Sequence, residues 1–299
     1  MRSAIGVDLG GSHLSVGLVS ENGEVLFSLR EDLPRKSAWA VTRQIGKLIH
    51  KLIEISAASP SCIGIGVPGL VNIQQGVVHQ SPHFPAWQNV PLQQLLSNQF
   101  ELPFTLHNDA SMFAYGEKCV GGGKNKSDFI LLTLGSGIGA GIILQDQLVS
   151  GSQGFAGEVG HMTIEQAGPL CSCGNRGCWE LYAASQSFQQ FASRAVPLQE
   201  LAELAEQGSE EALSFWKWYG GKLALGVHSL MNVFGVHDFL LSGAVSRAQQ
   251  FFLAETIKQV RSRSYRYYAE HLSIMPAVLG ENGGVIGSAL YSLSKTAQT

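Results

Sequence analysis

The chain has 299 residues, which is enough for two ordinary domains with a cleft between them. Its formal net charge of -3 and the lack of a basic block argue against nucleic acid or an anionic membrane as a partner, and favour a small molecule. The most apolar stretch, residues 129–144, contains four glycines and is shorter than a membrane span requires.

The N-terminus and the composition bear on location and assembly. The first residues lack the charged, apolar and cleavage-site regions of a secretory signal, so we expect a cytoplasmic protein. Only 14% of the residues are charged and 35 are glycine, which indicates tight turns and much buried surface, part of it between subunits. A homodimer or homotetramer is the assembly that we expect.

The first half of the chain predicts a sheet and the helices that cover it. In chain order, the predicted elements are a strand that begins at Ala4, a second strand joined to it at Gly10-Gly11, a third after the hairpin turn Asn22-Gly23, an amphipathic helix over residues 41–53, a buried strand over 62–67, a short strand over 104–107 that ends at Asn108-Asp109, and a helix over 110–119.

After a glycine-rich linker at residues 121–126, the same pattern restarts. It predicts a strand over 129–134, a turn, a strand over 140–144, a cysteine-rich loop and then mostly helices to about Met231. The restart indicates two lobes with related cores.

Two glycine-dense turns are suited to the two sides of a polyphosphate. Glycines let backbone N–H groups approach phosphate oxygens, and a nearby carboxylate can hold Mg²⁺ or its waters. Each turn alone is more typical of an ordinary hairpin, and neither matches the Rossmann or P-loop pattern. The residues are Asp8, Gly10, Gly11 and Ser12 in the first turn, and Gly135, Ser136 and Gly137 in the second.

Asp109 stands where a strand gives way to a helix. Phosphoryl transfer depends on positioning and electrostatics, with a carboxylate that accepts the hydroxyl proton of the substrate. A position of this kind can project such a carboxylate into a cleft. Asp is also a common helix cap, so the local sequence leaves both roles open for Asp109.

His161 and the cysteines Cys171, Cys173 and Cys178 form the strongest local motif. Three thiolates and one imidazole complete a tetrahedral zinc shell with no open position, so the predicted site is structural. Five cysteines in an intracellular chain are not expected to be a disulfide framework. Buried free cysteines are the alternative.

Glu158 and Glu180 flank this motif, and metal binding would fix both carboxylates. Together with an imidazole they suit the vicinal hydroxyls of a sugar, because an ionised carboxylate accepts two or more hydrogen bonds. The alternative is that they are ordinary surface carboxylates. The other histidines, His83 among them, are single and unpatterned, and we expect them to be structural or solvated.

Taken together, these residues resemble the ROK family of bacterial sugar kinases and repressors over essentially the whole chain. The motifs are Asp8-x-Gly-Gly-Ser-x4-Gly17, Gly64-x-Gly-x-Pro68-Gly69, Asn108-Asp109-Ala, Leu134-Gly-Ser-Gly-x-Gly, Gly154-x-x-Gly157-Glu-x-Gly-His161, Cys171-x-Cys-Gly-x-x-Gly-Cys178-x-Glu180, Leu241-Ser-Gly-Ala-Val-Ser and Gly284-x-x-Gly287-Ser-Ala.

The resemblance implies an α/β, two-lobed, actin-like ATPase fold of the ribonuclease H-like type, with a zinc-binding loop in the larger lobe. The smaller lobe would span residues 1–120, completed by a C-terminal helix at about 284–299, and the larger lobe residues 121–283. The resemblance also implies ATP, Mg²⁺ and structural Zn²⁺ as cofactors. The implied site residues are Asp109 as base; Gly69, Asn108, Asp109, Glu158, His161 and Glu180 at the sugar; Asp8, Gly10, Gly11, Ser12, Gly135, Ser136, Gly137, Gly243 and Ala244 at ATP and its metal; and His161, Cys171, Cys173 and Cys178 at zinc.

The implied activity is ATP-dependent phosphorylation of a hexose or N-acetylhexosamine hydroxyl. Glu158 resembles the glucose and N-acetylglucosamine kinases more than the N-acetylmannosamine kinases, so a glucokinase is favoured, followed by N-acetylglucosamine, allose and fructose kinases. Ser12 stands where Thr is more usual in the family and Ser242 where Gly is more usual. The alternatives are a sugar-sensing ROK regulator, which would carry a DNA-binding segment before Ala4, and a catalytically silent sugar-binding protein.

Overall fold

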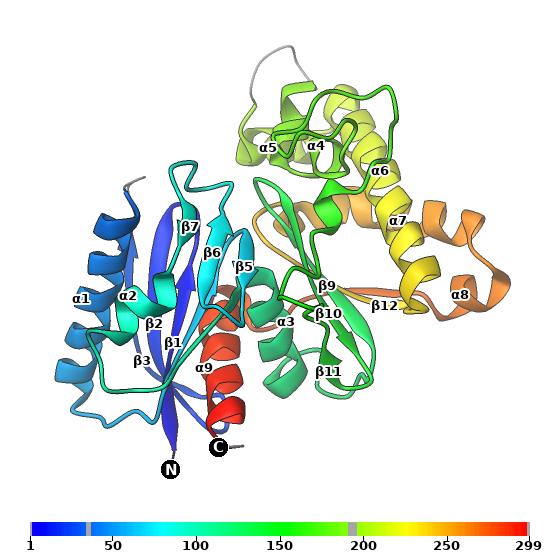
Figure 1. Cartoon of the computed structure of the whole chain (residues 1–299). Helices are drawn as coiled ribbons and strands as arrows, with labels where there is room; N and C mark the ends of the chain where they lie inside the picture. Colours follow the sequence, from blue (N-terminus) through cyan, green and yellow to red (C-terminus); the bar gives the residue numbers. More distant parts are fainter. Residues whose placement is uncertain (1, 34–36, 191–195, 298–299) are drawn as a thin grey trace. The chain divides into compact units, whose positions relative to one another are not determined.

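The computed structural model describes residues 2–33, 37–190 and 196–297 (Figure 1). The chain forms two compact α/β units. Unit 1 consists of residues 1–127, 141–157 and 278–299, and unit 2 of residues 128–140 and 158–277. The lobe boundaries given by the family resemblance stay a prediction.

Unit 1 is built on a five-stranded sheet with the order β3-β2-β1-β4-β8. The first three strands form an antiparallel meander, and β1, β4 and β8 run parallel. Because parallel strands end at the same edge of a sheet, the residues that follow β1, β4 and β8 gather there. The strands are β1 (Ser3–Leu9), β2 (His13–Ser20), β3 (Val25–Asp32), β4 (Ile63–Val67) and β8 (Phe104–Asn108).

Helices cover both faces of this sheet (Figure 1). On one face, buried apolar side chains of β1 pack in one cluster with those of α1. On the other face, α9 lies directly on the strands, because a Cβ on Gly6 or Gly64 would meet a backbone oxygen of α9 at 1.9 Å. The helices are α1 (Ala38–Ser56), α2 (Leu92–Ser97), α3 (Asp109–Val120), the 3-10 turn η4 (Gly280–Asn282) and α9 (Gly283–Thr296). A small sheet of β5 (Leu70–Asn72), β6 (Val77–Gln80) and β7 (Gln88–Val90) completes the unit.

Unit 2 contains most of the second sheet, whose order is β11-β10-β9-β12-β13. Its long helix α6 packs against α7 through the buried aromatic rings of Trp216, Tyr219 and Phe252. The strands are β9 (Phe129–Leu134), β10 (Ile138–Leu144), β11 (Gln147–Leu148), β12 (Asp238–Ser242) and β13 (Ser273–Pro276). The helices are η1 (Val159–His161), α4 (Glu180–Ala183), η2 (Ser185–Gln190), α5 (Leu198–Glu206), α6 (Glu210–Phe234), η3 (Val245–Ala248), α7 (Gln249–Arg263) and α8 (Arg266–His271).

The restart predicted after the glycine-rich linker is confirmed by the strand orders. In both sheets the first three strands are consecutive in the chain, and two later parallel strands extend the sheet on the side of the first strand. The strands and helices expected from residue 4 to residue 144 are present. The small sheet of unit 1 was not predicted, since its strands have only three or four residues. None of the described helices has the length and apolar character needed to cross a bilayer.

Candidate active site

Two carboxyl groups lie at the edge of the unit 1 sheet where its parallel strands end. Asp8 is the penultimate residue of β1, and Asp109 follows β8 as the first residue of α3. Burial raises the pKa of Asp8 to about 7, and the nearby charge of Asp109 adds to the rise. Burial also raises the pKa of Asp109, while the Ala110 N–H and His83 act in the opposite direction. The structure therefore brings two coupled, desolvated acids together.

The choice between cap and base for Asp109 can be made from the hydrogen bonds of α3. The cap residue is Asn108, whose side chain accepts a hydrogen bond from the Ser111 N–H at 3.1 Å. The Asp109 Oδ1 atom accepts one from the Ala110 N–H at 2.9 Å. Because Asn108 provides the cap, the helix does not need Asp109 in that role, and its carboxyl is available for chemistry.

Gly69 lies beside Asn108. The Asn108 Nδ2 atom donates a hydrogen bond to the Gly69 oxygen at 3.3 Å. Gly69 has φ of 109°, and a Cβ there would lie 2.2 Å from the Gln80 oxygen, so only glycine fits this turn. The predicted sugar residues of unit 1 are thus adjacent.

The first glycine turn connects β1 to β2. The Gly10 N–H donates to the His13 oxygen at 2.9 Å, which closes the hairpin. The Ser12 oxygen accepts a hydrogen bond from the Leu33 N–H at 2.8 Å, so the turn is also held to the end of β3. The turn follows Asp8 directly and lies at the same sheet edge as Asp109.

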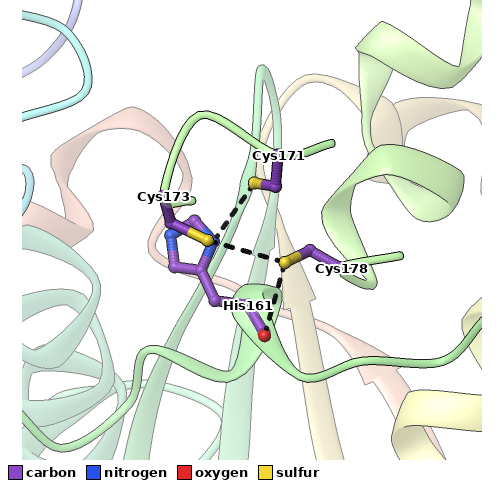
Figure 2. Close-up of side chains that lie close together, drawn as sticks. All are labelled: His161, Cys171, Cys173 and Cys178. Carbon is purple, nitrogen blue, oxygen red and sulfur yellow. Dashed lines mark hydrogen bonds between the residues drawn. The ribbon is translucent and has the colours of Figure 1, made fainter. Parts of the chain in front are cut away.

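In unit 2, the four predicted zinc ligands come together (Figure 2). Their ligand atoms all lie within 4.8 Å of one another. The Cys173 and Cys178 sulfurs are 3.6 Å apart, and the Cys171 sulfur is 3.7 Å from the His161 Nδ1 atom. Zinc–sulfur bonds of about 2.3 Å in a tetrahedron require sulfur atoms roughly 3.8 Å apart. The donor set therefore fits a zinc ion.

The carboxylates predicted at the sugar flank the same histidine. His161 Nε2 lies 3.9 Å from a Glu158 carboxyl oxygen, and His161 Nδ1 lies 3.6 Å from Glu180 Oε1. The Cys171 thiol donates to Glu180 Oε1 at 3.3 Å. Since Nδ1 faces the cysteines, a metal on that atom would leave Nε2 protonated and able to donate beside Glu158.

The second glycine turn lies beside Glu180. A Cβ on Gly137 would lie 2.7 Å from Glu180 Oε2, whereas a Cβ on Gly135 would meet nothing within 4 Å. Gly243, which follows β12, has φ of 88°, and a Cβ there would lie 2.4 Å from the Leu134 oxygen. Gly243 and Ala244 are thus next to the turn that contains Ser136.

His83 is a residue of this region that sequence reasoning missed. Its ring contacts Gly11, and its charge affects Asp109. It lies in a loop without periodicity, and only the Pro-His-Phe-Pro context could have indicated a shaped loop.

Comparison with known proteins defines the class. The sequence model of the ROK family matches residues 4–295, so the chain belongs to the ROK family. Its fold is the actin-like ATPase fold of the ROK kinase structures. A ROK family glucokinase from Streptomyces griseus, in complex with glucose and AMPPNP, aligns with a TM-score of 0.86 and 27% identity over 98% of this chain and 99% of that one.

The relatives fall into two functional groups. A glucokinase of Thermotoga maritima is 32% identical over 95% of this chain and 95% of that protein. A xylose repressor of Bacillus spizizenii is also 32% identical, over 95% of this chain and 75% of that protein. Membership of the family is therefore compatible with a kinase and with a regulator.

Proposed function

We propose that the protein is an ATP-dependent hexose kinase of glucokinase type, which converts sugar and ATP to sugar 6-phosphate and ADP. The observation that supports the proposal most strongly is the environment of Asp109. The Asp109 side chain is a desolvated carboxyl beside a glycine turn, and Asn108 relieves it of the capping role. The relationship to the Thermotoga maritima glucokinase and to the glucose complex of the Streptomyces griseus enzyme supports glucose as the first substrate to test.

In this mechanism Asp109 accepts the proton of the sugar hydroxyl as that oxygen attacks the γ-phosphorus of ATP. Asn108, Gly69, Glu158, His161 and Glu180 hold the sugar. Each ionised carboxylate can accept hydrogen bonds from two adjacent hydroxyls, which orients the ring. The raised pKa of Asp109 matters for this role, because a carboxylate with a low pKa has little affinity for the proton of the hydroxyl.

The proposed nucleotide site uses the backbone of both glycine turns. Gly10, Gly11 and Ser12 would contact phosphates, as would Gly135, Ser136 and Gly137. Gly243 and Ala244 would contact adenosine. Backbone N–H groups suit this task because they carry positive partial charge at fixed positions.

Two metal ions belong to the proposal. Asp8 would hold Mg²⁺ or its waters, and a divalent cation would favour the charged form of a carboxyl whose pKa burial and Asp109 raise to about 7 against the opposing charge of Arg30. Bound Mg²⁺ supplies positive charge against the polyphosphate. His161 with Cys171, Cys173 and Cys178 would hold a structural Zn²⁺, which would fix the segment that leads into Glu180, the first residue of α4.

A coupled ADP-release assay tests the proposal. The purified protein is supplied with ATP, Mg²⁺ and a panel of glucose, N-acetylglucosamine, N-acetylmannosamine, allose and fructose. We expect sugar-dependent ADP release that is highest with one hexose. No release with any sugar would refute a kinase.

The second candidate is a sugar-sensing regulator, which the xylose repressor relationship favours. It predicts sugar binding without ATP turnover, and binding to a DNA site at physiological salt. A gel-shift assay combined with sugar-binding calorimetry separates the two functions.

A further inference from the structure

His83 is held in place by the two aromatic residues that follow it in the loop between β6 and β7. Phe84 and Trp87 are only 2% and 1% exposed, and their rings stack at 4.6 Å. Their backbones are linked by a hydrogen bond from the Trp87 N–H to the Phe84 oxygen at 2.8 Å. Because both anchors are in the core of unit 1, the loop presents the His83 side chain from a rigid base.

The imidazole of His83 lies against the first glycine turn. A Cβ on Gly11 would be 2.6 Å from His83 Nδ1, 2.8 Å from Cγ and 2.9 Å from Cε1. No larger residue than glycine therefore fits at position 11 while the ring stays where it is. The ring and the backbone of the turn form one continuous surface.

His83 also acts on Asp109. Its charge lowers the pKa of the Asp109 carboxyl and opposes the rise that burial causes. The ring is half-buried, and its nitrogens form no hydrogen bond with any residue in the ranges 2–33, 37–190 and 196–297. An imidazole that lies against a glycine turn, acts electrostatically on Asp109 and has no hydrogen-bond partner among the described residues is placed to bind a ligand.

We propose that an imidazole N–H of His83 donates a hydrogen bond to an oxygen of the transferred phosphoryl group. This inference rests on the function proposed above. There, the glycine turn holds the phosphates and Asp109 receives the proton of the sugar hydroxyl, so a side chain that contacts the turn and acts electrostatically on Asp109 is suited to the path of transfer. His83 would thus be a catalytic residue that stabilises charge.

The step balances without a proton from His83. The sugar oxygen forms a bond to the γ-phosphorus, and its proton passes to Asp109. The bond from that phosphorus to the bridging oxygen breaks, and ADP leaves with the electron pair. His83 keeps its proton and stabilises charge on the equatorial oxygens, as a preorganised donor does.

His83→Ala tests the proposal and His83→Gln serves as the conservative variant. Loss of one donor to a developing charge costs about 10²–10³ in kcat. We expect a fall of this size in His83→Ala, with a sugar dissociation constant within twofold of the wild type. His83→Gln, which retains an N–H donor, recovers part of the loss. His79→Ala is the matched control, because His79 is four residues earlier, on β6, and bonds Asn89 at 2.6 Å.

A binding measurement separates a catalytic from a structural role. Aluminium fluoride bound with ADP in the presence of sugar mimics the transferred phosphoryl group. The affinity for this complex is compared with the affinity for ADP alone. We expect His83→Ala to weaken only the aluminium fluoride complex, by at least about tenfold. Unchanged kcat and unchanged affinity for this complex would overturn the role of His83, as would an equal loss with ADP alone. Absence of turnover in the wild type would instead overturn the kinase proposal, and this inference with it.

Discussion

Asn108 accepts a hydrogen bond from the backbone N–H of Ser111 at 3.1 Å and so caps α3. Its neighbour Asp109 is the first residue of the helix, where its carboxyl is desolvated and close to Asp8. The two consecutive residues of the Asn108-Asp109 motif therefore differ in their contribution to the helix. Asn108 stabilises the helix, which leaves the Asp109 carboxyl for the proposed role of base.

Asp109→Asn is expected to lower kcat by about 10²–10⁴-fold, because the substitution removes the general base. The sugar dissociation constant should stay within a few-fold, since the amide keeps the shape and a hydrogen-bonding oxygen. Steady-state kinetics and sugar-binding calorimetry measure the two effects. Asp146→Asn, which changes an exposed carboxyl of the same unit, is the control. A kcat within threefold of the wild type would exclude Asp109 as the base.

Cys173→Ser is expected to abolish stoichiometric zinc binding and to weaken sugar binding by about tenfold or more, because the proposed zinc would hold His161 and the start of α4 at Glu180 in place. Elemental analysis gives the metal content and calorimetry the sugar affinity. Cys119→Ser removes a thiol of α3, outside this cluster, and should change neither. Full sugar affinity in a zinc-free Cys173→Ser protein would show that the metal does not organise the pocket.

Gly137→Ala and Gly135→Ala form a matched pair within one turn. Alanine at position 137 meets the Glu180 carboxyl at 2.7 Å and must displace it, while alanine at position 135 enters open space. We expect Gly137→Ala to raise the sugar dissociation constant several-fold in the absence of nucleotide, and Gly135→Ala to leave it unchanged. Equal sugar affinities for the two variants would argue against a sugar contact by Glu180.

The burial of His107 leads us to expect that the free energy of unfolding falls in acid. His107 is fully buried, its Nδ1 accepts a hydrogen bond from the Asn108 N–H at 2.8 Å, and its Nε2 lies 3.0 Å from the Ser150 hydroxyl. Burial, with a smaller effect of Lys295, lowers the pKa of His107 from 6.5 to about 4. Below pH 6.5 the unfolded chain therefore binds a proton that the native state does not, until the pH reaches about 4.

From about pH 7.5 to about pH 5, this linkage removes roughly 2 kcal/mol from the free energy of unfolding. Urea denaturation at the two values should show a smaller decrease in His107→Gln than in the wild type. His50→Gln, on the exposed side of α1, should behave as the wild type does. An identical decrease in His107→Gln and the wild type would contradict the assignment.

The sequence predicts local features of the fold and site well where a strong local pattern is present. Alternation and glycine turns identify β1, β2 and the β9–β10 hairpin, and the spacing of Cys171, Cys173 and Cys178 predicts that these side chains lie together as potential metal ligands. The local sequence could not show whether Asp109 caps α3, because that depends on which side chain accepts the hydrogen bond from the Ser111 N–H.

The position of His83 against the first glycine turn could not be predicted either, and the reason is different. Its contact with Gly11 joins residues 72 positions apart, and it depends on the burial of Phe84 and Trp87. Nothing in the immediate sequence of His83 encodes that contact. The close approach of α9 to Gly6 and Gly64 is likewise a tertiary effect, visible only once the sheet is formed.

The most direct test of the central claim is phosphorus NMR of the product formed by the wild type and by Asp109→Asn from ATP, Mg²⁺ and glucose. We expect a sugar 6-phosphate resonance that grows with that of ADP in the wild type and is nearly absent with Asp109→Asn. If glucose and the other sugars of the panel bind but no sugar phosphate forms with the wild type, the protein is not a kinase of these sugars, and the central claim is contradicted.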